Sequence, residues 1–378
     1  MKARWKTFIF GVMAAFLSVF GTLIAAELLL RFLPYRQGLQ AQAVTTDQPV
    51  FRFARNRNST FSDDWNFNQV NRVRVNNDGF VNDADYDPEK KTPIIAIVGD
   101  SYIEAAMVPF QETVQGRLSS SLKDNGRAYS FAASGAGLSQ YLVWARYARD
   151  KYRPDLFLIS IIQNDFAESL HYREHSPGFW RFDRSVDGTF AWKLTEYRPS
   201  LIRRAMRHSA LAMYLTQNVK VQNVLNFNIQ NLGGDDRRWV GNVEAVSTDQ
   251  QMNDFHWAVD RFLELLPSYT GVTVDRIMLS FDGFRPHMYG SDEDREFARR
   301  STWGIMRNEM IQKATKLGMI TIDLDPPMQQ RYRRDRKRFE FPTNSHWNGL
   351  GHEVLSDAVI QTDAYLKLFG PVKDKIGN

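Results

Sequence analysis

A short, wholly apolar segment that ends at a glycine constrains this chain more than any other stretch of it. Residues 94–98 (IIAIV) are rich in β-branched side chains, and Gly99, Asp100 and Ser101 follow directly. An unbroken apolar run of this length is typical of a strand that is buried on both faces of a parallel sheet. Reactive groups in open α/β sheets collect at the carboxyl ends of the strands. We therefore expect the Ser101 hydroxyl at a cleft, either as a nucleophile or as a turn and helix-capping serine.

Strand-like and helix-like segments alternate along the rest of the chain. Further buried strands are expected at 128–133, 155–162, 276–281 and 319–323, and helices at 111–122, 140–150, 297–317 and 352–368. Strands that alternate with helices indicate a parallel sheet covered by helices on both faces. The predicted fold is a flavodoxin-like three-layer α/β/α sandwich with about five parallel strands.

The N-terminus predicts a membrane anchor. Thr7 to Ala26 carries no charged residue, and three basic residues precede it. About 20 apolar residues span a bilayer as a helix. Ile24 stands where a signal-peptide cleavage site needs a small residue, so we expect an uncleaved anchor at 1–35, with a cleaved signal peptide as the alternative. The body of this single-pass protein is then predicted to lie on the periplasmic side of the inner membrane.

Two segments interrupt the regular pattern. Residues 36–91 are interpreted as a polar linker followed by a hairpin segment, because Asn77 to Phe80 (NDGF) is a hairpin-type turn signal. Residues 92–370 form the predicted catalytic domain, with an insertion at about 168–250 that is rich in aromatic, Arg and Asn residues. We expect this insertion to be a lid or a substrate-binding element, with a helix near 209–224.

Composition excludes several kinds of site. The absence of cysteine excludes disulfides, thiolate metal sites and cysteine nucleophiles. The net charge of +5 is spread along the chain, so a nucleic-acid partner is not indicated. His346 and His352 have no accompanying carboxylate cluster, and Gly135 to Gly137 lacks the third glycine of a dinucleotide-binding loop. We therefore expect neither a metal nor a cofactor.

Three further polar groups are expected at the same edge of the sheet as Ser101. Gly135 follows the second strand, Asn164 follows the third, and His346 precedes the final helix. A serine nucleophile needs a base, which is usually histidine. The oxyanion formed by its attack needs hydrogen-bond donors. The backbone N–H groups of Ser101 and Gly135 and the side-chain amide of Asn164 are suitable donors.

With these residues in place, the chain resembles the SGNH hydrolases, the superfamily of GDSL esterases, from Thr92 to Leu368 apart from the insertion. Gly99-Asp100-Ser101 matches the nucleophile block, Gly135 and Asn164 match the second and third blocks, and His346 matches the block of the catalytic histidine. The resemblance implies that Ser101 is the nucleophile, that Gly135 and Asn164 form the oxyanion hole, and that His346 is the base. The segment containing Asn77 to Phe80 also resembles membrane-anchored bacterial members.

The sequence departs from the family at one position. The family usually carries Asp two or three residues before the catalytic histidine, where this chain has Asn344 and Thr343. Asp to Asn in a serine protease triad lowers turnover about 10⁴-fold. Three interpretations stay open: a Ser101–His346 dyad, a replacement acid such as Asp323 or Asp325, or a weakened site kept for binding.

The resemblance and the anchor together imply hydrolysis of an acyl ester, with acetyl as the expected group, on a substrate such as O-acylated envelope polysaccharide. The alternatives are an O-acetyltransferase that modifies a cell-envelope glycan and a catalytically weakened glycan-binding or assembly protein. The expected partners are an acylated glycan, the membrane and proteins of envelope polysaccharide biosynthesis. Residues 331–338 (RYRRDRKR) are expected in a loop that is either simply solvated or a landing site for an anionic glycan or lipid headgroup.

Overall fold

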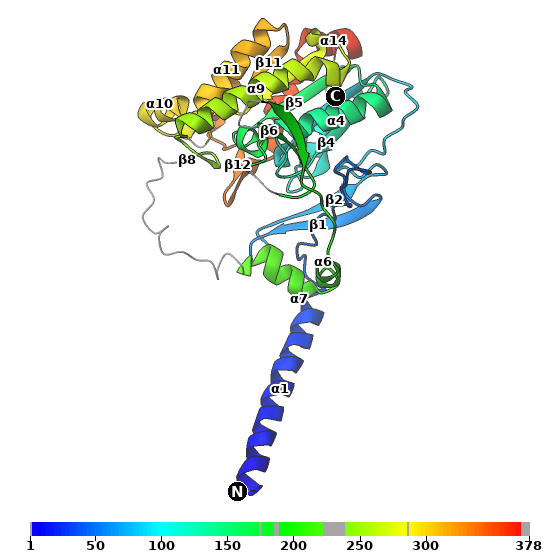
Figure 1. Ribbon diagram of the computed structural model, residues 1–378, viewed down its shortest axis with the longest axis vertical. Coiled ribbons are helices and arrows are strands. Elements are labelled where there is room, and N and C mark those ends of the chain that lie inside the picture. Colours follow the sequence, from blue (N-terminus) through cyan, green and yellow to red (C-terminus); the bar gives the residue numbers. More distant parts are fainter. Residues whose placement is uncertain (1, 174–175, 185–188, 222–238, 286, 372–378) are drawn as a thin grey trace.

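The computed structural model describes residues 2–173, 176–184, 189–221, 239–285 and 287–371, and a five-stranded sheet lies at its centre (Figure 1). Its strands are β3 (Ile94–Gly99), β4 (Arg127–Ala132), β5 (Leu156–Ile161), β10 (Ile277–Phe281) and β11 (Ile320–Asp323). Every pairing within this sheet is parallel, in the order β11-β10-β5-β3-β4. The predicted α/β/α sandwich is therefore confirmed.

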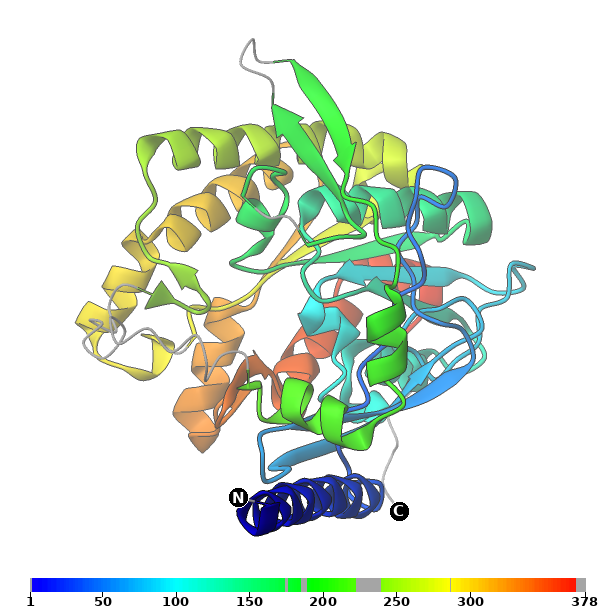
Figure 2. The ribbon, with the colours of Figure 1, turned by 60° about the horizontal axis from the view of Figure 1, so that its bottom comes forward.

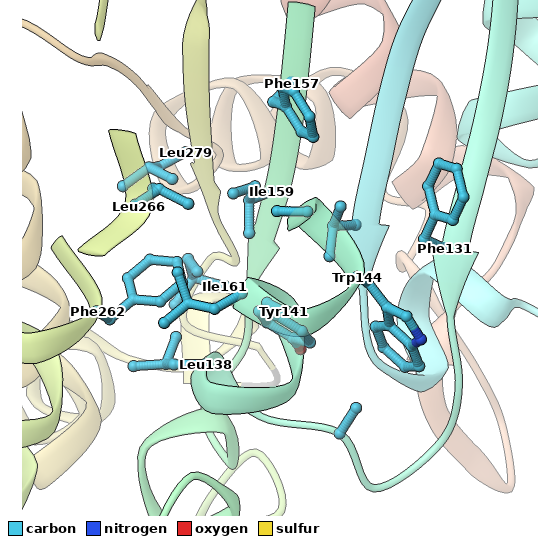
Figure 3. Packing of buried hydrophobic residues seen from close by; sticks show 14 of the residues in the cluster. Phe131, Leu138, Tyr141, Trp144, Phe157, Ile159, Ile161, Phe262, Leu266 and Leu279 are labelled. Carbon is cyan, nitrogen blue, oxygen red and sulfur yellow. The ribbon is translucent and has the colours of Figure 1, made fainter. Parts of the chain in front are cut away.

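The two faces of the sheet bury alternate side chains of the same strands, because successive residues of a strand point to opposite faces. Ile95 and Ile97 of β3 pack with α3 (Val114–Leu122), α13 (Gly349–Ile360) and α14 (Asp363–Phe369). Ala96 and Val98 belong to the larger cluster on the other face, which includes α4 (Leu138–Tyr152), α9 (Asp249–Thr270) and α11 (Thr302–Lys316). Figure 3 shows part of that cluster, where Trp144 and Phe262 lie against the sheet.

The order of the strands explains why the predicted site residues converge. The chain passes from β3 to β4 on one side and then crosses to β5 on the other side of β3. Ligands in open α/β sheets bind at such a reversal of strand order. The segments that follow β5, β3 and β4 therefore emerge side by side at one edge of the sheet.

The predicted helices differ from the observed ones at several places, and the helix expected at 352–368 is two helices, α13 and α14. The helix expected at 297–317 is two helices, α10 (Asp292–Arg300) and α11, because the Ser301 hydroxyl accepts the Gly304 N–H and starts a new helix. The 22-residue helix α9 was missed by the sequence analysis, although Thr248 and Gln251 form a capping box at its start. The run 331–338 was expected in a loop, but most of it belongs to α12 (Asp325–Asp335).

The N-terminal segment is packed against the domain, which corrects its interpretation as a linker. Val44, Phe51 and Phe53 are buried in the larger core cluster, because the segment carries enough large apolar side chains to join it. It leads into an antiparallel hairpin of β1 (Arg57–Asp63) and β2 (Gln69–Val75). The turn at 77–79 lies after this hairpin and is closed by a single bridge between Val75 and Val81.

Of the predicted insertion, residues 174–175, 185–188 and 222–238 lie outside the described residues, and so does the end of the helix expected at 209–224. The elements that the structure describes in this segment are β6 (Trp180–Arg184), β7 (Phe190–Leu194), α6 (Leu201–Met206), α7 (Ala210–Met213), the π-helical turn η2 (Tyr214–Asn218), β8 (Trp239–Val240) and β9 (Val243–Glu244). The strands β6 and β7 pair with each other, as do β8 and β9.

One helix, α1 (Lys2–Leu30), projects away from the rest of the structure (Figure 1). Its segment Trp5–Leu30 has a mean hydropathy of 2.3 and is long and apolar enough to cross a membrane. The Glu27 carboxylate near its end accepts hydrogen bonds from the Ser209 hydroxyl and from the N–H groups of Ala210 and Leu211. These bonds fasten α1 to α7, and Figure 2 shows α6 and α7 in green beside the blue α1.

Candidate active site

Ser101 and His346 meet at the carboxyl edge of the sheet. Ser101 is the first residue of α2 (Ser101–Glu104), directly after β3, and His346 lies on β13 (Asn344–Trp347), which pairs with β12 (Glu340–Phe341). The Ser101 Oγ lies 2.7 Å from the His346 Nε2, although 245 positions separate the two residues. This is the distance that proton transfer from a serine hydroxyl to an imidazole requires.

Asn344 sets the tautomer of His346. Its Oδ1 accepts the main-chain N–H of His346 at 3.1 Å and lies 2.5 Å from the ring Nδ1. The backbone contact identifies this atom as the amide oxygen, which carries no hydrogen, so the ring nitrogen must be the donor. The Nδ1 of His346 therefore carries the proton, and the lone pair of Nε2 faces the hydroxyl of Ser101.

Asp63 holds the asparagine in this orientation, and the sequence analysis missed it. The Asn344 Nδ2 donates to the Asp63 Oδ2 at 3.4 Å, and Lys220 lies 3.1 Å from the Asp63 Oδ1. Asp63 is buried at the end of β1, in a polar stretch whose sequence carries no signal of a catalytic role. Only the docking of the hairpin against β13 brings it to the site.

The two acids considered as replacements are engaged elsewhere. Asp323 pairs with Arg307, and Asp325 accepts the main-chain N–H of Phe284 at 3.1 Å and the side-chain amide of Gln329 at 2.6 Å. Neither forms a hydrogen bond with His346 in the part of the chain that the structure describes. The carboxylate that reaches the histidine, through Asn344, is that of Asp63.

Two of the expected oxyanion donors are main-chain N–H groups, those of Ser101 and Gly135. Gly135 follows β4 with a φ of +83°, a left-handed backbone conformation that favours glycine. Within the described residues, the main-chain N–H groups of Ser101 and Gly135 donate no hydrogen bond. Both groups are thus free for an incoming oxygen.

Asn164 is oriented by groups that the sequence analysis did not identify. Its Nδ2 donates to the Glu168 Oε2 at 2.7 Å and to the Asp100 Oδ2 at 3.4 Å, and its Oδ1 accepts from Asn242 at 3.1 Å. The amide of Asn164 therefore contacts the side chain of the residue that directly precedes Ser101. A bound oxyanion would replace Asp100 as the acceptor of the hydrogen bond of 3.4 Å from the Asn164 amide.

A buried polar network supports the segment that carries His346. The Arg285 guanidinium donates to Asp282 at 2.6 and 3.1 Å and to the main-chain carbonyl of Ser345 at 3.2 Å. The Tyr102 hydroxyl donates to the same carbonyl at 3.1 Å, and the Trp347 indole donates to Asp282 at 2.9 Å. The neighbours of His346 on both sides are therefore fixed, which limits the movement of its ring.

Burial shifts the protonation of the groups at the site. It lowers the pKa of His346 to about 4, and the positive charges of Arg285 and Arg36 contribute to this shift. Burial also raises the pKa of the Asp100 carboxyl to about 6 and that of Glu104 to about 7. Glu104 accepts the N–H of Ser134 at 2.8 Å. His346 is therefore neutral at physiological pH, and an imidazole in this form can accept a proton.

Two cavities adjoin the segment 342–346. The smaller, of about 320 Å³, is lined by His346, Asn344 and charged residues that include Arg36 and Glu104. The larger, of about 1240 Å³, lies against Tyr102 and Gln163 and carries basic residues of the 331–338 run at its rim. No group of His, Asp and Glu in the described residues is arranged to hold a metal ion.

No family model matches the chain, and no curated protein sequence matches it significantly. Solved structures do match. In fold, the chain is similar to GDSL lipolytic enzymes. A GDSL-family lipolytic protein from Veillonella parvula is 9% identical over 72% of this chain and 98% of its own, with a TM-score of 0.37.

Two further similar structures carry related descriptions. A lipase/acylhydrolase from Enterococcus faecalis is 13% identical over 71% of this chain and 93% of its own, with a TM-score of 0.34. A two-domain esterase active on acetylated mannans is 10% identical over 74% of this chain and 50% of its own, with a TM-score of 0.35. Similarities at this level concern the general arrangement of the fold. The chemistry of the site is inferred from the positions of Ser101, His346 and Asn344 in this structure.

Proposed function

We propose that this protein is a serine-dependent acyl ester hydrolase in which Ser101 is the nucleophile and His346 is the general base. The observation that carries this proposal is the 2.7 Å contact between the Ser101 Oγ and the His346 Nε2. The orientation of the ring by Asn344 supports it, because that tautomer leaves Nε2 free to accept the serine proton.

The reaction follows from this geometry. The His346 Nε2 takes the proton of Ser101 as the Oγ attacks the carbonyl carbon of the ester. The N–H groups of Ser101 and Gly135 and the amide of Asn164 stabilise the oxyanion. His346 then returns the proton to the departing alkoxide, which leaves an acyl group on Ser101. A water molecule, deprotonated by His346, releases that group as a carboxylic acid.

The substrate we propose is an O-acetylated polysaccharide of the cell envelope. The helix α1 would span the inner membrane with the catalytic domain on the periplasmic side, and the Glu27 contacts with α7 would hold that domain close to the bilayer. A membrane-held esterase works on material close to the bilayer, and envelope glycans under assembly, with the proteins that build them, occur there.

A second candidate is an O-acetyltransferase, in which a sugar hydroxyl replaces water in the second step. The cavity of about 1240 Å³ beside Tyr102 is large enough for a sugar acceptor, and this observation favours transfer as the alternative. The same acyl-Ser101 intermediate serves both reactions.

The test is to measure release of nitrophenol from 4-nitrophenyl acetate by the full-length protein in detergent. We expect turnover that Ser101→Ala abolishes and that Ser120→Ala, at an exposed serine of α3, retains. Adding an oligosaccharide then separates hydrolysis from transfer, because the acetyl group ends either as acetate or on the sugar. An inert wild-type protein that also resists serine-directed phosphonates would leave only a binding role.

A further inference from the structure

We propose that the cavity beside His346 contains a binding site for an anionic group of the substrate, with Arg36 as the residue that binds it. This inference rests on the proposed function, since it names the class of ester that the site accepts. The ligand group is a carboxylate or a phosphate attached to the acylated sugar.

Arg36 is held rigidly at the mouth of the site. Its main-chain N–H donates to the Asn218 Oδ1 at 2.8 Å. The next residue, Gln37, donates its N–H to the Thr60 carbonyl at 3.0 Å and accepts the Thr60 N–H with its side chain at 3.2 Å. The backbone of Arg36 is therefore fixed against β1, and a side chain on a fixed backbone loses less entropy when it binds a ligand.

The guanidinium of Arg36 has unused donors. It lies 4.4 Å from the centroid of the Phe61 ring, and it forms no hydrogen bond or ion pair with any residue that the structure describes. A guanidinium has five N–H donors, so stacking on Phe61 leaves its edge available. His346 lines the same cavity, so Arg36 and one member of the Ser101–His346 pair share it.

The acidic groups nearest to Arg36 are already engaged. Asp63 pairs with Lys220 at 3.1 Å and accepts from Asn344 at 3.4 Å. Glu104 accepts two hydrogen bonds from Ser134, and burial raises its pKa to about 7, so part of the population carries no charge at neutral pH. Asp63 and Glu104 stabilise the charge of Arg36 from a distance, but among the described residues neither forms a hydrogen bond or an ion pair with its guanidinium.

These properties determine the chemical class of the ligand. The planar fork of arginine matches the two oxygens of a carboxylate or the oxygens of a phosphate, and such paired contacts are among the strongest hydrogen bonds in proteins. The cavity volume of about 320 Å³ has room for roughly one sugar ring, so the anion and the ester would lie on the same or on adjacent sugar units.

The experiment compares acetylated sugars that differ only in charge, using the full-length protein in detergent. The substrates are the acetyl esters of methyl glucoside, methyl glucuronoside and methyl glucoside 6-phosphate, so that only the group at C6 varies. We expect kcat/KM to be about tenfold higher for at least one anionic ester than for the neutral one. Preference for the glucuronoside identifies a carboxylate as the ligand group, and preference for the 6-phosphate ester identifies a phosphate.

Substitutions then connect the preference to Arg36. Arg36→Gln should bring the kcat/KM for the anionic ester close to that for the neutral ester, mainly through a higher KM for the anionic ester. Arg36→Lys should keep part of the preference for the anionic ester. Arg72→Gln is the matched control, because Arg72 is an exposed arginine on the adjacent strand β2 and lies outside the cavity. The Arg72→Gln variant should keep the wild-type ratio of kcat/KM between the anionic and the neutral ester.

Binding separates a failure of this inference from a failure of the proposed function. Saturation-transfer NMR with glucuronic acid, glucose 6-phosphate and glucose needs no turnover. If esters are hydrolysed with no anionic preference, and Arg36→Gln and the wild type give the same ratio, the Arg36 site is wrong while the esterase stands. If no ester is hydrolysed but an anionic sugar binds in a manner that needs Arg36, the esterase is wrong while the anion site stands.

Discussion

The carboxylate of Asp63 lies 3.4 Å from the side-chain nitrogen of Asn344, so the N-terminal hairpin supplies a negative charge to the segment that carries His346. Asn344 occupies the position at which a catalytic triad has an acid beside the histidine. Here the acid is Asp63, which contacts Asn344 and not the His346 ring. Asp63 acts here as a positioning residue, because it touches Asn344 and not the reacting atoms. It fixes the amide so that the oxygen faces the imidazole.

Replacement of Asp63 by Asn should therefore lower kcat by up to about 10²-fold, because the amide of Asn344 loses the contact that fixes its orientation. The double variant Asp63→Asn/Asn344→Asp exchanges the two groups and should recover activity relative to either single variant. The pH–rate profile of the double variant should also shift its acid limb to higher pH, since a carboxylate would then face the His346 ring. Equal losses in all three variants would indicate a purely structural role.

The pH dependence of the wild type follows from the lowered pKa of His346. The ring must be neutral to accept the serine proton, and burial together with Arg285 and Arg36 lowers its pKa to about 4. Activity should therefore persist down to mildly acidic pH and fall as the pH drops through about 4. A profile of kcat/KM against pH measures this limb. A limb near 6.5 would mean that His346 is solvated and not held as described.

Asn164 should contribute through the transition state. Removing one side-chain donor from an oxyanion hole lowers kcat about 10²- to 10³-fold, with a much smaller effect on KM. We expect this result for Asn164→Ala in steady-state kinetics with 4-nitrophenyl acetate. Asn242→Ala removes only a group that orients Asn164 and should have a smaller effect. An Asn164→Ala enzyme with an unchanged kcat would exclude this amide from the oxyanion hole.

Glu104 should make the stability of the fold depend on pH. Burial raises its pKa from 4.5 to about 7, so the folded state binds more protons than the unfolded state between these values. Stability due to this group is present below about pH 4.5 and is lost as the pH rises towards 7. Glu104→Gln should remove a penalty on the order of 3 kcal/mol at pH 8 and change little at pH 4. Chemical denaturation of both proteins at the two pH values measures the difference.

The sequence predicted the central sheet well, because the strands β3 and β5 are continuous apolar runs whose burial on both faces leaves a strong signal. The expected positions of Ser101, Gly135 and Asn164 followed from the same signal, since each comes directly after a strand. The convergence of His346 with Ser101 required a family resemblance, because a β-hairpin far along the chain delivers the histidine.

Asp63, Glu168 and Asn242 were not predicted, and each lies in a segment whose docking depends on tertiary contacts. Asp63 ends a polar strand, and Asn242 occupies the short turn between β8 and β9. Polar residues in such segments look like ordinary solvated residues in the sequence. The packed segment before β1 was misjudged for a related reason, because Val44, Phe51 and Phe53 are too few in this polar stretch to form a sustained periodic pattern.

Covalent labelling is the most direct measurement of whether Ser101 is an activated nucleophile. The full-length protein is incubated with a fluorophosphonate and digested, and the modified peptide is identified by mass spectrometry. We predict a single phosphonyl adduct on Ser101, formed in the wild type and strongly slowed in His346→Gln. Absence of the adduct in the folded wild type, or a rate that does not depend on His346, would contradict the account.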